Sequence, residues 1–123
     1  MDKVLLSHGS GRGLQKMLET VILPSLIGES DEVLEDAAVI DWNTGSAVVF
    51  TTDSFVVTPR TFPGGDIGKL AACGTINDLA MMGAVPSHMS VALIIEAGLP
   101  FDELRTYLGS LKKICMEQNV RIA

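Results

Sequence analysis

Three aspartates of this sequence are placed where a carboxylate could serve a metal ion. Asp36 and Asp53 stand at the ends of apolar stretches, and Asp78 lies inside one. Singly, each aspartate is more often a turn former than a ligand. Together with the amide of Asn77, the three carboxylates make an all-oxygen donor set, which suits Mg²⁺ and not zinc. The sequence therefore predicts a magnesium site formed by Asp36, Asp53 and Asp78.

The position of Asp78 within its apolar run strengthens this interpretation. If residues 66–82 form a helix, a rotation of ~100° per residue brings Asp78 within about 20° of Ile67, on an apolar face that also holds Gly74. A carboxylate buried on such a face costs several kcal/mol without a partner. Lys69 points about 180° away around the same helix. The alternatives that remain open are a metal or ligand role, a salt bridge and a backbone cap.

Two glycine-rich segments could present backbone N–H groups to a phosphate. They are Gly9-Ser10-Gly11-Arg12-Gly13 and Gly64-Gly65-Asp66. The second precedes the helix over 66–82, so helix N–H groups and the helix dipole could add to an anion site. Neither segment has the spacing of a Walker A or Rossmann glycine motif.

Covalent catalysis is not indicated, and no catalytic residue is assigned. Ser7, Ser54 and Cys73 have no base partner in a recognisable motif, and His8 and His88 lack a second ligand at metal spacing. We interpret both histidines as surface or core residues.

Composition excludes several classes of protein. The chain has 123 residues, enough for one domain, and a net charge of −6 with a pI near 4.7, which opposes nucleic-acid binding. No apolar run approaches the ~18–20 residues of a membrane span, and the N-terminus does not resemble a signal peptide. The two cysteines lack metal spacing, which is typical of a reduced, cytoplasmic protein.

The apolar patterning predicts the element order α, β, β, α, β, α, β, with a solvated acidic loop over 28–36. The expected elements are a helix from Leu14 that Pro24 ends, strands 37–42 and 47–52 joined by a hairpin turn at 43–46, a possible extension over 54–58, a helix over 66–82 capped by Asp66, a strand over 88–96, a helix from Phe101 to Cys115, and a strand that starts at Val120. This order favours an α+β fold with a ferredoxin-like sheet and helices on one face.

Three blocks of the chain resemble the HypE family of hydrogenase maturation proteins. The blocks are Thr51-Thr-Asp-Ser-Phe-Val-Val57, Phe62-Pro-Gly-Gly-Asp-Ile-Gly-Lys-Leu-Ala71 and Cys73-Gly-Thr-Ile-Asn-Asp-Leu-Ala-Met-Met-Gly-Ala84, and the shorter Ser7-His-Gly-Ser-Gly11 and Glu35-Asp-Ala-Ala38 fit as well. The family belongs to the ATP-binding superfamily of aminoimidazole ribonucleotide synthetase, selenophosphate synthetase and thiamine-monophosphate kinase.

The resemblance implies an ATP- and Mg²⁺-dependent carbamoyl dehydratase. Such proteins receive a carbamoyl group on a C-terminal cysteine from the carbamoyltransferase HypF and dehydrate this thiocarbamate to a thiocyanate. The cyanide then passes to the [NiFe] hydrogenase iron through the HypC–HypD complex. By the same resemblance, Asp36, Asp53 and Asp78 match Mg²⁺–phosphate ligands. Asn77 would orient phosphate or a water on the metal, and Lys69 and the segment 9–13 are weaker candidates for phosphate contacts.

The chain also departs from the family pattern. Arg12 stands one place early, and the sequence stops before a Gly-Asp-Thr-Lys segment, the C-terminal domain and the cysteine tail. We therefore expect residues 1–123 to be a truncated N-terminal ATP-binding and dimerisation domain that forms a homodimer and is catalytically silent alone. Two alternatives stay open: a non-catalytic dimerisation or partner-docking domain, and another synthetase such as selenophosphate synthetase. The second is disfavoured because no cysteine precedes Cys73.

Overall fold

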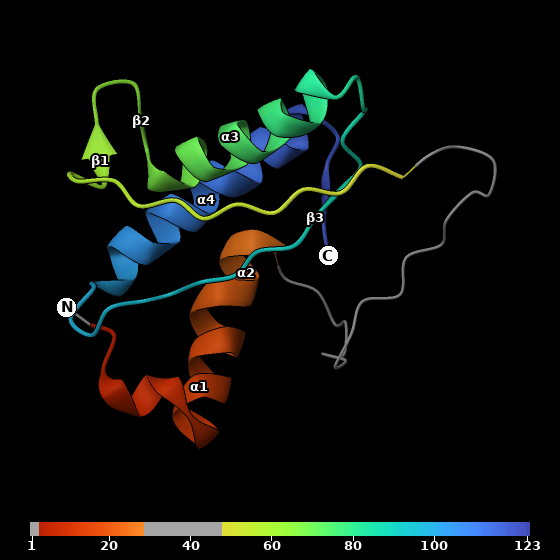
Figure 1. Cartoon of the computed structure of the whole chain (residues 1–123). Coiled ribbons are helices and arrows are strands. Elements are labelled where there is room, and N and C mark those ends of the chain that lie inside the picture. Colours follow the sequence, from red (N-terminus) through yellow and green to blue (C-terminus); the bar gives the residue numbers. More distant parts are fainter. Residues whose placement is uncertain (1–2, 29–47) are drawn as a thin grey trace.

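The computed structural model describes residues 3–28 and 48–123, and its centre is a helix packed between two other helical layers. This central helix, α4 (Phe101–Glu117), has α3 (Ile67–Met81) along one side and an N-terminal helical rod on the other (Figure 1). The acidic loop at 28–36, Asp36 and the hairpin strands up to residue 47 lie outside the described residues, apart from Gly28.

The N-terminal rod continues past Pro24, so the prediction that this proline ends the helix is wrong. The rod consists of η1 (Leu6–Gly9), α1 (Gly11–Met17), the π-helical turn η2 (Leu18–Ile22) and α2 (Leu23–Leu26). Proline has no N–H, which breaks an α-helical ladder. Here the ladder widens just before the proline, because the Leu23 N–H bonds to the Leu18 carbonyl five residues back. The wider turn accommodates Pro24 without ending the helix.

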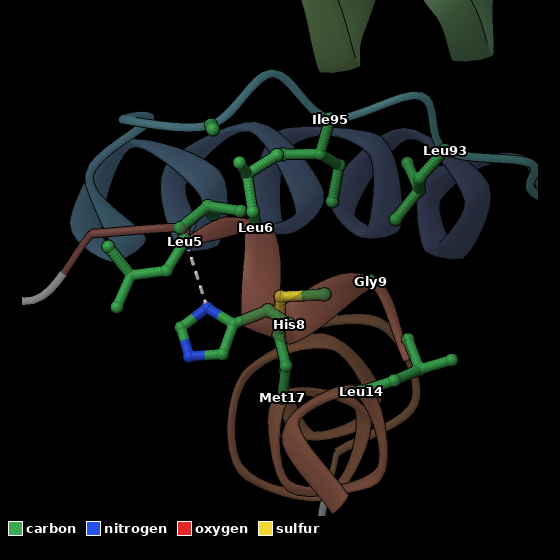
Figure 2. Close-up of a pocket in the computed structure, with 10 residues that line it drawn as sticks. Leu5, Leu6, His8, Gly9, Leu14, Met17, Leu93 and Ile95 are labelled. Atoms are coloured by element: carbon green, nitrogen blue, oxygen red, sulfur yellow. Dashed lines mark hydrogen bonds between the residues drawn. The ribbon is translucent and has the colours of Figure 1, made fainter. Parts of the chain in front are cut away.

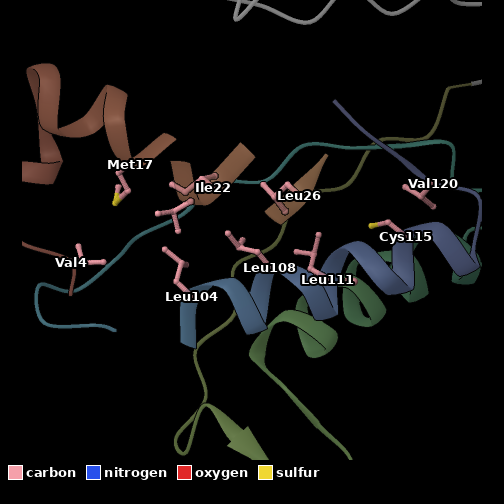
Figure 3. Packing of buried hydrophobic residues seen from close by; sticks show 11 residues of the cluster. Val4, Met17, Ile22, Leu26, Leu104, Leu108, Leu111, Cys115 and Val120 are labelled. Carbon is pink, nitrogen blue, oxygen red and sulfur yellow. The ribbon is translucent and has the colours of Figure 1, made fainter. Parts of the chain in front are cut away.

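The apolar stripe predicted along the last helix is confirmed and forms the core. Leu104, Leu108, Leu111 and Cys115 of α4 are buried against side chains of the rod (Figure 3). The residues that meet them are Met17, Val21, Ile22 and Leu26, with Val4 and Val120 at the two ends. Each leucine fully buried in this way contributes about 1.5–3 kcal/mol.

The sheets of the described residues are small. β1 (Thr61–Phe62) pairs antiparallel with β2 (Gly65–Asp66), and β3 (His88–Met89) pairs parallel with β4 (Arg121–Ile122). The strand expected from Val120 is confirmed as β4. Of the strand expected over 88–96, the ladder includes only the first two residues, although Val91 and Ile95 still pack against the core. The described part of the second expected strand, from residue 48, and its extension to 58 run as an extended segment without a ladder. The α+β class is therefore observed, and the ferredoxin-like sheet stays a prediction.

Neither described range contains a helix with both the length and the apolar composition needed to cross a bilayer.

The helix predicted over 66–82 is confirmed as α3, and its start is fixed by two contacts with α4. Asp66 caps the helix: its carboxylate accepts the Lys69 N–H at 3.0 Å and the Ser110 hydroxyl of α4 at 2.6 Å. Two residues further on, Gly68 approaches the backbone of α4 so closely that a Cβ there would overlap the Tyr107 carbonyl oxygen. The two helices can therefore adopt this spacing only with glycine at position 68.

This contact predicts opposite effects for two glycine-to-alanine changes in the helix pair. Gly68→Ala should lower the free energy of unfolding by about 1–3 kcal/mol or more, because the new methyl group forces α3 from α4. Gly109→Ala in α4 should raise it by roughly 0.5–1 kcal/mol, since a Cβ at Gly109 meets nothing within 4 Å. Urea denaturation of both variants measures this. A Gly68→Ala variant as stable as the parent would contradict the packing described.

Candidate functional site

The predicted phosphate-binding residues Gly64, Gly65 and Lys69 come together in a hairpin before α3. β1 and β2 are joined by Pro63-Gly64, and Gly64 has φ +91°, the conformation that the third position of a type II turn requires. Lys69 reaches back across this turn, and its Nζ donates to the Gly64 carbonyl at 2.9 Å. An exposed ammonium group thus lies directly beside the two glycines.

Part of the hydrogen-bonding capacity at the start of α3 is already used within the chain. The Ile67 N–H donates to the Arg60 carbonyl at 2.9 Å, and the Lys69 N–H donates to Asp66. Two of the first-turn N–H groups are therefore committed to the hairpin and to the helix cap. A phosphate here would depend on the Lys69 ammonium and on the remaining backbone N–H groups.

The predicted metal ligands Asp53 and Asp78 belong to two elements that run side by side. The segment 48–60 lies along α3 in the opposite direction (Figure 1). Phe55 contacts Gly74 of α3, where an added Cβ would lie 2.6 Å from the phenyl ring. The inward side chains of the segment alternate with exposed ones, as in a strand, since Thr51, Phe55 and Val57 are half-buried.

The Phe55–Gly74 contact brings Asp53 and Asp78 to the same level along α3. Asp53 lies two residues back along the extended segment, roughly 6–7 Å from Phe55 at ~3.3 Å per residue. Asp78 lies four residues further along the helix, about 6 Å from Gly74 at ~1.5 Å per residue. Residues two apart in a strand share a side, and residues four apart in a helix share a face. Both residues therefore lie toward the same end of the segment–helix pair, beyond the Phe55–Gly74 contact.

The burial expected for Asp78 is wrong, because its side chain is exposed, as are those of Asn77 and Asp53. The apolar run around Asp78 packs less completely than the helical pattern implied, since α4 and segment 48–60 cover only part of α3. The two ion pairs of the described ranges lie elsewhere, at Arg60–Glu103 and Arg105–Asp102. A salt bridge to Asp78, the structural alternative considered above, is thus not formed within the described residues.

The donor chemistry fits Mg²⁺, although the described part of the chain contains only two of the three predicted ligands. Asp53 Oδ1 accepts the Ser54 N–H at 2.7 Å, which fixes the carboxylate and leaves its other oxygen toward solvent. No group of three His, Cys, Asp or Glu side chains suited to a metal occurs within 3–28 and 48–123, and Asp36 lies outside these ranges. The assignment of Asp36, Asp53 and Asp78 to one magnesium ion remains a prediction.

The glycines of the N-terminal segment differ in what they do. Gly13 is required by packing, because a Cβ there would overlap the Ser7 carbonyl oxygen. Gly9 and Gly11 meet nothing within 4 Å, and Gly11 has φ +53° at the start of α1. This segment lies on the far side of α4 from the β1–β2 hairpin (Figure 1), so the structure does not bring the two glycine-rich segments together.

A cavity of about 310 Å³ opens beside this segment. Figure 2 shows His8, Gly9 and Met17 facing Leu93 and Ile95 across it. His8 Nδ1 accepts the Leu5 N–H at 3.1 Å, and its ring lies 5.3 Å from that of Phe101. His8 thus has structural contacts within the chain, and the residues that line the cavity are mainly apolar.

The two cysteines are free thiols with different surroundings. Cys73 is half-buried in α3, and Cys115 is buried in the core beside Met89, with 3.7 Å between the sulfur atoms. Burial raises the pKa of the Cys115 thiol, which therefore remains protonated and unreactive near neutral pH.

Sequence reasoning missed a row of polar side chains on α4. Glu103, Tyr107 and Ser110 are four and three residues apart, so they form one stripe beside the apolar stripe. This polar seam, defined by these three residues, contacts the β1–β2 hairpin and its flanking residues. The spacing was visible in the sequence, but the partners at Arg60, Thr61 and Asp66 were not.

Comparison with known proteins connects this chain to a family. The N-terminal domain of AIR synthase related proteins matches residues 34–123. The carbamoyl dehydratase HypE of Escherichia coli K12 is 36% identical over 99% of this chain, and that of Rhodobacter capsulatus is 41% identical over 98%. The chain spans 38% and 36% of the lengths of these two relatives.

Solved structures give the same relationship. A crystal structure of the hydrogenase maturation protein HypE in complex with ATP superposes on 97% of this chain with a TM-score of 0.85 and 38% identity, and the match covers 35% of that chain. A crystal structure of E. coli HypE matches 88% of this chain, with a TM-score of 0.79 and 35% identity, and the match again covers 35% of that chain.

Proposed function

Because this chain belongs to the family of AIR synthase related proteins, through the N-terminal domain of that family, we propose that it binds ATP together with Mg²⁺. The observation that carries the proposal is the likeness to the HypE structure solved with ATP, which extends over nearly the whole chain. The exposed, all-oxygen donors Asp53 and Asp78 and the ammonium of Lys69 supply groups that suit a metal–polyphosphate ligand.

The proposal gives these residues separate tasks. Asp53 and Asp78, together with Asp36, hold Mg²⁺, which neutralises phosphate charge when bound. Asn77, next to Asp78 and also exposed, orients the phosphate or a water on the metal. Lys69, which bonds to the Gly64 carbonyl, moves its ammonium to a phosphate oxygen, while Gly64 and Gly65 let the phosphate approach the backbone.

The finer proposal is that the chain takes part in hydrogenase maturation as HypE does. In that reaction ATP phosphorylates the oxygen of a cysteine thiocarbamate, the oxygen then leaves as phosphate with loss of both N–H protons, and a thiocyanate and ADP remain. The chain corresponds to just over a third of the length of these two curated relatives. The dehydration, the partners HypF and HypC–HypD, and a cytoplasmic location consistent with two free thiols are therefore proposals for the function to which this domain contributes.

Removal of either exposed carboxylate should weaken ligand binding and leave the stability of the fold unchanged. Asp53→Asn and Asp78→Asn should each weaken Mg²⁺–ATP binding about tenfold or more, because a charged ligand contact is lost. Both variants should unfold at the parental urea concentration, because both side chains are exposed. Calorimetric titration with Mg²⁺–ATP measures the affinity.

Glu96→Gln is the matched control, because it removes one exposed negative charge from another part of the chain. It should bind Mg²⁺–ATP as the parent does. Equal binding by all three variants and the parent would contradict the metal site, and loss of folding in Asp78→Asn would indicate a structural role.

A second function, homodimerisation, is favoured by apolar side chains on two extended segments, residues 48–60 and 90–96. Ile94 is 103% exposed and Val56 is 94% exposed, while their neighbours Val91, Ile95 and Phe55 turn inward. Extended chains with unpaired backbone groups and an outward apolar face are prone to pair with another chain. We propose that these segments pair between two copies, within the ferredoxin-like sheet expected from the sequence.

Ile94→Asp should shift the chain from dimer to monomer without lowering its stability, because Ile94 has no packing to lose within one copy. Light scattering at micromolar concentration measures the mass. Gln118→Glu adds the same charge at an exposed position outside both extended segments and should leave the dimer intact. A parent chain that is monomeric at this concentration would rule out the homodimer.

A further inference from the structure

The polar seam of α4 holds the β1–β2 hairpin by three side chains. Glu103 Oε2 accepts from Arg60 Nη2 at 3.2 Å and from the Tyr107 hydroxyl at 2.9 Å. Tyr107 also lies 3.4 Å from the Thr61 hydroxyl. Ser110 donates to Asp66, at the other end of the hairpin. The seam thus contacts the residue before β1, the first residue of β1 and the last residue of β2.

The hairpin depends on these contacts because it has little to stabilise it otherwise. Its ladder is two residue pairs long, Thr61 with Asp66 and Phe62 with Gly65. A two-stranded hairpin of this kind is marginal in water unless it packs against another element. Tyr107 is buried as a residue, whereas Arg60 and Glu103 are about half exposed, so the hydroxyl of a well-packed tyrosine anchors a partly hydrated ion pair.

The anchored residues are the ones that position the groups proposed to meet phosphate. The carbonyl of Arg60 accepts the Ile67 N–H, and the carbonyl of Gly64 accepts Lys69 Nζ. Movement of Arg60 would therefore shift the start of α3 and the turn together. Lys69 can contact a phosphate at a fixed place only while the start of α3 and the turn at Gly64 keep their relative positions.

We propose that Glu103 and Tyr107 are positioning residues, which hold the Gly64-Gly65 turn and Lys69 in the geometry that binds a polyphosphate. Neither side chain contacts the ligand. The proposal rests on the proposed nucleotide-binding function, and it adds a layer of the site that comes from α4 and is distant in sequence from the glycine and aspartate motifs.

The test measures binding of inorganic tripolyphosphate without a divalent metal, so that metal coordination by the aspartates does not contribute. Glu103→Ala and Tyr107→Phe should each weaken binding about two- to fivefold, the effect of losing a partly exposed polar contact. For Glu103→Ala, the direction in which the affinity for tripolyphosphate changes distinguishes lost geometry from lost charge. Removal of a negative charge by itself would favour an anion, so weaker binding indicates loss of geometry.

Asp102→Ala is the matched control. Asp102 is also acidic, lies in the same first turn of α4 and forms an ion pair of the same 3.2 Å length, but with Arg105 and not with the hairpin. This variant should bind tripolyphosphate as tightly as the parent or slightly more tightly. Ile114→Val, a mild change on the core side of α4, controls for lost stability and should also bind normally.

Amide hydrogen exchange provides a readout that needs no ligand. The Ile67 N–H should exchange several-fold faster in Glu103→Ala and Tyr107→Phe, and at the parental rate in Asp102→Ala. Unchanged exchange and binding in the seam variants would overturn the positioning role while leaving the nucleotide site intact. A parent chain that does not bind tripolyphosphate would overturn the role of the hairpin in phosphate binding, and with it this proposal.

Discussion

The rest of the structure depends on the close approach of α3 to α4 at Gly68. With no Cβ at this position, the α3 backbone rests against the Tyr107 carbonyl. Asp66, two residues earlier, also ties α3 to α4, because its carboxylate caps α3 and accepts the Ser110 hydroxyl of α4. A buried carboxylate is tolerated there because hydrogen bonds compensate its lost hydration. The contact fixes the axis of α3, and the axis in turn sets where the turn at Gly64 and the exposed Asp78 lie.

α4 therefore has two roles that its sequence keeps on separate stripes. The apolar stripe buries Leu104, Leu108 and Leu111 against the N-terminal rod and supplies one side of the core. The polar seam faces the hairpin. Since a helix repeats every 3.6 residues, both stripes continue along α4 without competing for positions. The candidate site thus lies on exposed parts of the hairpin, segment 48–60 and α3, which pack directly or indirectly on the central helix α4.

Local patterns in the sequence predicted the features that depend on neighbouring residues alone. The stripe from Phe101 to Cys115 and the cap at Asp66 depend only on spacing and side-chain chemistry, and both are confirmed. Three features were beyond such reasoning. The π-helical turn before Pro24 depends on how the rod packs, the exposure of Asp78 depends on how much of α3 its neighbours cover, and the partners of the polar seam lie more than 40 residues away in the chain. A shared site for Asp53 and Asp78 was predicted from residue type and stays a prediction; the Phe55–Gly74 contact places both residues toward the same end of α3.

The central claim, that Asp53 and Asp78 serve one metal ion, can be tested most directly with Mn²⁺ as a paramagnetic substitute for Mg²⁺. Both ions favour oxygen ligands, and Mn²⁺ broadens the NMR signals of nearby amides. At substoichiometric Mn²⁺ in the presence of ATP, the amides of residues 53–55 and 77–79 should broaden together at the same metal concentration. Those at the C-terminal end of α4, around Glu117, should stay sharp. Broadening of only one of the two groups, or of neither, would contradict the account.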